Sequence, residues 1–224
     1  MVGCHTLSKS IELVRRWVKP VLSISIDGFV GGRDGGIKWV FSTDQEAIAW
    51  TVATVWNASL HIMGARTFHD MAAYWPTSTE VFATPMNQIP KAVFSRQGRA
   101  ILRAATTTAA LVDARANAGA PPSAQLQPGA DSWAQAYVAG GDLVQEVMKL
   151  KAREGKPILA HGGAGFARSL IARGLVDQYA LVVYPIALGT GLPIFTGLAV
   201  PRSLKLIGSK AFPSGSVVQI YRPA

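Results

Sequence analysis

The stretch PILAHGGAGFARSLIARGLVDQYALVVYP, residues 157–185, decides the fold class. An apolar run at 157–160 leads to the adjacent glycines Gly162 and Gly163, a helix-forming segment at 165–174 and a second apolar run at 179–185. Strand, helix and strand in this order are typical of a parallel β-α-β unit. Because glycines leave backbone N–H groups uncovered at a helix start, the turn suits a phosphate. A tight turn without a ligand explains the same residues equally well.

The same alternation extends along the chain. Further strands are predicted at 21–26, 59–64, 91–95 and 216–221. Helices are predicted from a cap at Thr43 or Asp44 to about Asn57, from Thr67 to before Pro76, and within 141–155. Alternating strands and helices favour an α/β sheet covered on both faces.

Length and composition favour one large domain behind a short extension. The chain has 224 residues, 49% of them hydrophobic, and a formal net charge of +9. Four basic residues lie in the first nineteen, so we treat 1–19 as an N-terminal extension and 20–224 as the domain. We expect no membrane span and no metal site, and no nucleic-acid partner because aromatic stacking motifs do not accompany the basic residues. The single cysteine, Cys4, fits a reducing cytosol, so we expect a cytoplasmic protein.

Residues 97–130 differ in composition from the rest. They are rich in Ala, Thr, Gly, Pro and Gln, and AGAPPSAQLQPGA at 118–130 has the composition of a flexible connector. We predict a flexible insertion at about 97–130, either a lid or a disordered segment.

Two further strand ends carry groups that suit an anion. MGARTFHDM, residues 63–71, places Gly64, Arg66 and Thr67 after a strand, and VFSRQGR, residues 93–99, does the same for Ser95 and Arg96. In open α/β sheets, ligands bind beyond the carboxyl ends of the strands, and an arginine fork bonds two phosphate oxygens at once. Together with the glycine pair, these residues predict a ligand with several phosphates.

Residues 20–224 resemble a known family, that of the C-terminal domain of the riboflavin-biosynthesis deaminase–reductase. This family has a dihydrofolate-reductase-like fold. The matching pieces, in order, are SISIDGFVGG with IKWV, MGARTFHDMAAYWP, KAVFSR, GDLVQEVMKLK, the stretch from ILAHGGAGF to GTGLPIF, and FPSGSVVQIYRP. The resemblance implies a mixed, mostly parallel central sheet flanked by helices, NADPH as hydride donor, and a homodimer.

The resemblance also implies roles for individual residues. The pyrophosphate turn would consist of Gly162, Gly163, Ala164, Gly165 and Phe166, with a cis peptide bond between the paired glycines. The other residues it places at the cofactor are Gly64, Arg66 and Thr67 alongside it, Ser95 and Arg96 near the adenosine 2′-phosphate, and Ile26, Asp27 and Gly28 beside the nicotinamide.

The resemblance says less about the residues that would contact the substrate. His161 stands where the riboflavin-pathway reductases usually carry a glutamate, and a histidine cannot supply that carboxylate. Asp27 is the candidate catalytic residue, although an aspartate before a glycine is also an ordinary turn residue. The resulting hypothesis is an NADPH-dependent reductase of a small heterocyclic or sugar-like substrate, of the pteridine or ribosylaminopyrimidine type. The alternative is a non-catalytic nucleotide-binding module.

Overall fold

The computed structural model describes residues 16–103 and 108–224. Its strands are β1 (Val18–Ser25), β2 (Leu60–Gly64), β3 (Lys91–Phe94), β4 (Tyr137–Ala139), β5 (Ile158–Ala160), β6 (Tyr179–Tyr184), β7 (Leu204–Ala211) and β8 (Val217–Pro223). Its α-helices are α1 (Gln45–Trp56), α2 (Ala65–Ala72), α3 (Ala83–Gln88), α4 (Ala109–Ala116), α5 (Leu143–Lys151) and α6 (Ala164–Ala172). Short 3₁₀ helices occupy Lys38–Val40, Gly98–Leu102 and Ala130–Trp133.

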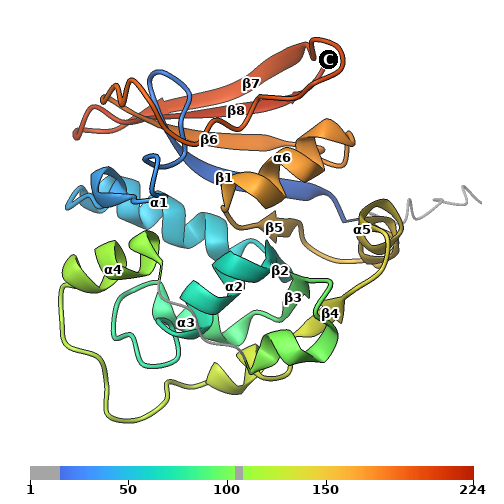
Figure 1. The fold of residues 1–224 in the computed structure, drawn as a ribbon. Coiled ribbons are helices and arrows are strands. Elements are labelled where there is room, and N and C mark those ends of the chain that lie inside the picture. Colours follow the sequence, from blue (N-terminus) through green and yellow to red (C-terminus); the bar gives the residue numbers. More distant parts are fainter. Residues whose placement is uncertain (1–15, 104–107) are drawn as a thin grey trace, which may run out of the picture.

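The strands form one sheet in the order β4-β3-β2-β5-β1-β6-β8-β7 (Figure 1). Pairs from β4 to β6 are parallel, whereas β8 runs antiparallel to both β6 and β7. The prediction of a mixed, mostly parallel α/β sheet is therefore confirmed. The carboxyl ends of β1, β2, β3 and β5 meet at one edge, and this edge carries the site.

Alternating side chains place an apolar layer on each face of the sheet. In β2, Leu60 and Ile62 point into a core shared with α5 and α6, whereas Met63 points into a second core with α1, α2 and α3. This alternation follows from the period of two along a strand. α6 contributes side chains to the first core and α2 to the second, so these two helices cover opposite faces of the sheet.

The first strand begins earlier than the sequence predicted, whereas the first helix begins at a predicted cap. β1 begins at Val18, two residues inside the predicted extension; most of 1–19 lies outside the described residues. Asp44 is the N-cap of α1, and its carboxylate accepts the backbone N–H groups of Glu46 and Ala47 at 3.0 and 3.2 Å. In the described ranges no helix is both long and apolar enough to cross a membrane.

The segment predicted as a flexible insertion contains a helix. α4 lies within it, capped by the Thr108 hydroxyl, which accepts the N–H of Leu111 at 3.2 Å. Leu111 is buried, and Asp113, only 3% exposed, accepts the N–H of Ile37 at 2.7 Å. A cap, an apolar contact and a buried hydrogen bond thus attach this helix to the domain, while the flexibility of 97–130 stays a prediction.

Candidate functional site

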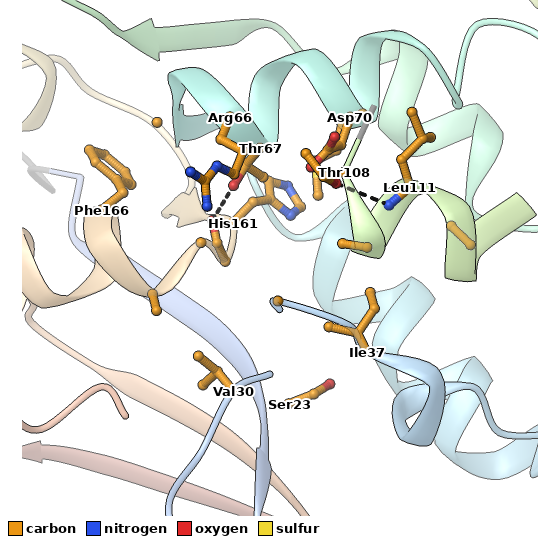
Figure 2. Close-up of a pocket in the computed structure, with 18 of the residues that line it drawn as sticks. Ser23, Val30, Ile37, Arg66, Thr67, Asp70, Thr108, Leu111, His161 and Phe166 are labelled. Atoms are coloured by element: carbon orange, nitrogen blue, oxygen red, sulfur yellow. Dashed lines mark hydrogen bonds between the residues drawn. The ribbon is translucent and has the colours of Figure 1, made fainter. Parts of the chain in front are cut away.

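A cavity of about 720 Å³ opens at the carboxyl edge of the sheet. Side chains of α2 and α4 form one side, the start of α6 forms a second, and β1 with the loop that follows it forms a third (Figure 2). The volume is in the usual range for a small-molecule site, about 300–1,000 Å³.

The glycine turn faces this cavity at the N-terminus of α6. Gly163 has φ +99°, a conformation that favours glycine, and a Cβ built there would lie 2.5 Å from the Thr67 hydroxyl. That hydroxyl donates to the Gly162 carbonyl at 2.8 Å, which joins α2 to the turn. Gly165 differs, since a Cβ there would meet nothing within 4 Å. The open space above Gly165 lies where uncovered helix N–H groups favour an anion.

The cis peptide bond expected between Gly162 and Gly163 is not present. All peptide bonds in the described ranges are trans. The positive φ of Gly163 supplies the change of direction between β5 and α6, so this prediction is wrong.

Phe166, in the first turn of α6, packs against the ends of the neighbouring strands. Its Cβ lies 3.1 Å from the position of a Cβ on Gly64, so a larger residue at the end of β2 would have to displace Phe166. The Phe166 ring also packs against Phe94, with ring centroids 5.0 Å apart. The ends of β2, β3 and β5 are held together through this contact.

The structure brings eight of the sequence-predicted cofactor residues together around the cavity. They are Gly64, Arg66, Thr67, Gly162, Gly163, Ala164, Gly165 and Phe166. Arg66 is exposed at the same end as Arg168, so two guanidinium groups border the glycine turn.

The other five predicted residues lie outside the cavity lining. Ser95 is buried, and its hydroxyl accepts the N–H of Gln97 at 3.1 Å, whereas Arg96 is exposed just beyond β3. Ile26 is 69% exposed, and Gly28 forms the turn after β1 with φ +92°.

Asp27, the predicted catalytic residue, forms hydrogen bonds to backbone groups of the loop after β6 and to a side chain at the end of β1. Its carboxylate accepts the N–H groups of Leu188 and Gly189 at 3.1 and 2.7 Å and the Ser25 hydroxyl at 2.5 Å. The Ser25 hydroxyl contributes most to lowering the Asp27 pKa, so the group is ionised at neutral pH. These bonds give Asp27 a turn-stabilising role, and an ionised, exposed carboxylate does not favour proton donation; its assignment as the catalytic residue stays a prediction.

His161 lines the cavity next to the glycine turn. Its ring meets that of His61 edge-on at a centroid distance of 4.6 Å, and within the described ranges its Nε2 has no hydrogen-bond partner. Burial, with a smaller contribution from the charge of Lys91, lowers the His161 pKa to about 4. The imidazole is therefore neutral at pH 7.

Sequence reasoning missed Asp70 and the residues of α4. Asp70 lies one helical turn after Arg66 and Thr67, so all three point from α2 toward the cavity (Figure 2). The spacing of three and four residues was a signal that could have found it. The helix α4 beside Thr108 was not predicted, because the composition of 97–130 is typical of a flexible connector.

Comparisons with known proteins agree with this architecture. The family model of the RibD C-terminal domain matches residues 16–218. Two uncharacterized proteins of Bacillus subtilis, YyaP and YwjB, are 37% and 33% identical over 87 and 73 residues. These matches cover 39% and 33% of this chain and 46% and 41% of the relatives, so the chain spans under half the length of either.

Solved structures share the fold at low identity. A putative riboflavin biosynthesis protein of Shewanella sp. PV-4 has a TM-score of 0.64 at 20% identity, over 93% of this chain and 99% of that one. A deaminase/5-amino-6-(5-phosphoribosylamino)uracil reductase of Thermotoga maritima gives 0.61 at 17%, over 94% and 57%. A pyrimidine reductase-like protein of Corynebacterium diphtheriae gives 0.56 at 16%, over 93% and 92%.

Proposed function

The chain belongs to the RibD C-terminal domain family, and from that premise we propose that it is an NADPH-dependent reductase of a small nitrogen heterocycle. One observation carries the proposal: the turn at Gly162–Gly163 and the space above Gly165 open into the same cavity as Arg66 and Thr67. An anion-binding helix end beside a largely apolar cavity fits a phosphorylated cofactor and a flat substrate.

The residues present fit such a cofactor. The backbone N–H groups at the start of α6 would bond its pyrophosphate, with Arg66 beside them. We retain Arg96 as the proposed partner of the 2′-phosphate, since it is exposed at the end of β3, the strand next to β2 in the sheet. When bound, NADPH supplies the hydride, and the chain's own residues orient the acceptor and exclude water from it.

The substrate class comes from the relatives. One structural neighbour is described as a pyrimidine reductase-like protein and another as a reductase of a ribosylaminopyrimidine. We extend a pyrimidine or pteridine type of substrate to this chain as a proposal. His161 would contribute a neutral imidazole at the position next to the glycine pair.

The test is a fluorescence titration with NADPH and NADH, followed by NADPH oxidation with candidate heterocycles. Tighter binding of NADPH with turnover supports the reductase. Binding without turnover for every pyrimidine and pteridine tried supports the non-catalytic nucleotide-binding module. Absence of NADPH binding refutes both.

Assembly and location are proposals of the same kind. β7 is an edge strand of the sheet, and Leu206 and Ile207 on it are 50% and 43% exposed. Because exposed apolar side chains on an edge strand favour pairing with another chain, we propose a twofold homodimer. A cytoplasmic location rests on the single cysteine, Cys4.

A further inference from the structure

Three carboxyl groups line the cavity, and two of them are already bonded within the chain. Asp34 accepts the N–H of Gly36 at 2.9 Å, and Glu80 accepts the Tyr74 hydroxyl at 2.8 Å. The third, Asp70, has a buried Oδ1 that lacks a hydrogen-bond partner among residues 16–103 and 108–224. A carboxylate accepts about four hydrogen bonds, so Asp70 retains capacity for a ligand.

The surroundings of Asp70 are largely apolar, so an unused hydrogen-bond acceptor there destabilises the folded protein when no ligand is bound. Met71, Ile37 and Leu111 supply apolar surface around the same cavity. Burial raises the Asp70 pKa, and the Thr108 hydroxyl and the charges of Arg66 and His69 offset this only in part. A buried acceptor without a partner destabilises the folded state, which favours a role in binding over a role in stability.

The other polar groups of the cavity leave Asp70 as the acceptor at its α4 end. Arg66 and Arg168 line the cavity beside the glycine turn, where the proposed cofactor phosphates would lie, and both are hydrogen-bond donors only; Arg66, one helical turn before Asp70, also lowers the Asp70 pKa through its charge. His161 is neutral, and the Tyr74 hydroxyl donates a hydrogen bond to the Glu80 carboxylate. Figure 2 shows Asp70 and Thr108 side by side, from α2 and from the segment leading into α4.

Building on the proposed reductase function, we propose that Asp70 accepts a hydrogen bond from an N–H group of the substrate and thereby sets its orientation. The substrate class is an amino-substituted or ring-N–H heterocycle that is uncharged or cationic at this edge. A carboxylate or phosphate at the same edge is excluded by repulsion. Asp70 is a specificity-determining residue in this assignment, and α4 supplies the apolar wall beside it.

The experiment measures fragment binding in the absence of any cofactor. The probes are 2,4-diaminopyrimidine and 2,4-dimethoxypyrimidine, which share a ring and a similar size but differ in N–H donors. Dissociation constants are measured by ligand-observed NMR for the wild type, Asp70→Asn and Asp34→Asn. The last variant is the matched control, because it removes the same charge from another carboxyl of the same cavity that already has a partner.

We expect the wild type and Asp34→Asn to prefer the diamino compound by about tenfold or more, as for a hydrogen bond to a charged group. Asp70→Asn should lose most of this preference while remaining at least as stable in a thermal melt at neutral pH. An equal preference in the wild type and Asp70→Asn, or no binding of the diaminopyrimidine at millimolar concentration, overturns the assignment.

A separate NADPH titration of the same three proteins tests the proposed function. Normal NADPH binding by Asp70→Asn with a lost diamino preference supports both proposals. Failure of all three proteins to bind NADPH, with the diamino preference intact, refutes the reductase but leaves the N–H acceptor site in place.

Discussion

Replacing Gly165 by valine tests whether the turn at the start of α6 holds a pyrophosphate. A Cβ at Gly165 meets no atom within 4 Å, and Gly165 is not among the positive-φ glycines, so the new side chain projects into open cavity without backbone strain. Valine is no worse than glycine within a helix, so folding should be unaffected. We expect the melting temperature to stay close to that of the wild type while NADPH affinity falls at least about tenfold, as expected for loss of a charged hydrogen-bonding site.

Gly163→Ala provides the contrast. A residue forced into a rare backbone conformation costs about 1–3 kcal/mol. The added Cβ also lies 2.5 Å from the Thr67 hydroxyl, so the bond from Thr67 to Gly162 must shift. For a chain of this length, that cost lowers the melting temperature by about 2–12 °C.

Gly119→Val is the control, since Gly119 has open space around it and lies outside the cavity lining. All three variants are compared by thermal melts without ligand and by fluorescence titration with NADPH. A folded Gly165→Val protein that binds NADPH as tightly as the wild type would refute a pyrophosphate site at this turn.

Four further outcomes are expected. NADPH should bind about ten- to a hundredfold more tightly than NADH, and Arg96→Met should reduce this ratio; an unchanged ratio removes Arg96 from the site. Burial lowers the His161 pKa from about 6.5 to about 4, so the stability it contributes is present above about pH 6.5 and is lost as the pH falls toward 4. Urea melts across that range should show a shallower decline for His161→Gln, and an identical decline contradicts the reasoning. Asp113→Asn should weaken the bond to Ile37 and speed hydrogen exchange in 108–116, with unaltered exchange as the contrary result. Light scattering should give twice the monomer mass, and a monomer at micromolar concentration would contradict the dimer.

Much of the parallel sheet could be predicted because its strands have strong apolar signals. Strands β1, β2, β3, β5 and β6 each contain buried apolar residues, and glycines or helices follow β1, β2, β3 and β5. β7 was missed because most of its side chains are exposed, which leaves no alternation to detect. β4 has three residues and is too short for any periodic signal.

The side of the cavity around the glycine turn was largely predictable because its glycines stand in short motifs at the ends of strands. The side chains that Gly64 and Gly163 face, Phe166 and Thr67, lie far away in sequence and could not be predicted. The substrate side depends on segments that are remote in sequence, such as Asp113 reaching Ile37 across 76 positions. Asp27 shows the opposite case, since an acidic residue before a glycine suits catalysis and a turn equally until its partners, Leu188 and Gly189, are known.

The hydrogen bond from Thr67 to Gly162, which links residues 95 positions apart, has a consequence for folding. Contacts between remote segments form only after the loss of chain entropy needed to close the intervening loop. Because β2 and β5 join segments equally far apart, we expect the glycine turn to form together with the pairing of these two strands. A ligand that binds only the finished cavity would then protect the native state by mass action, adding stability in proportion to the logarithm of its concentration.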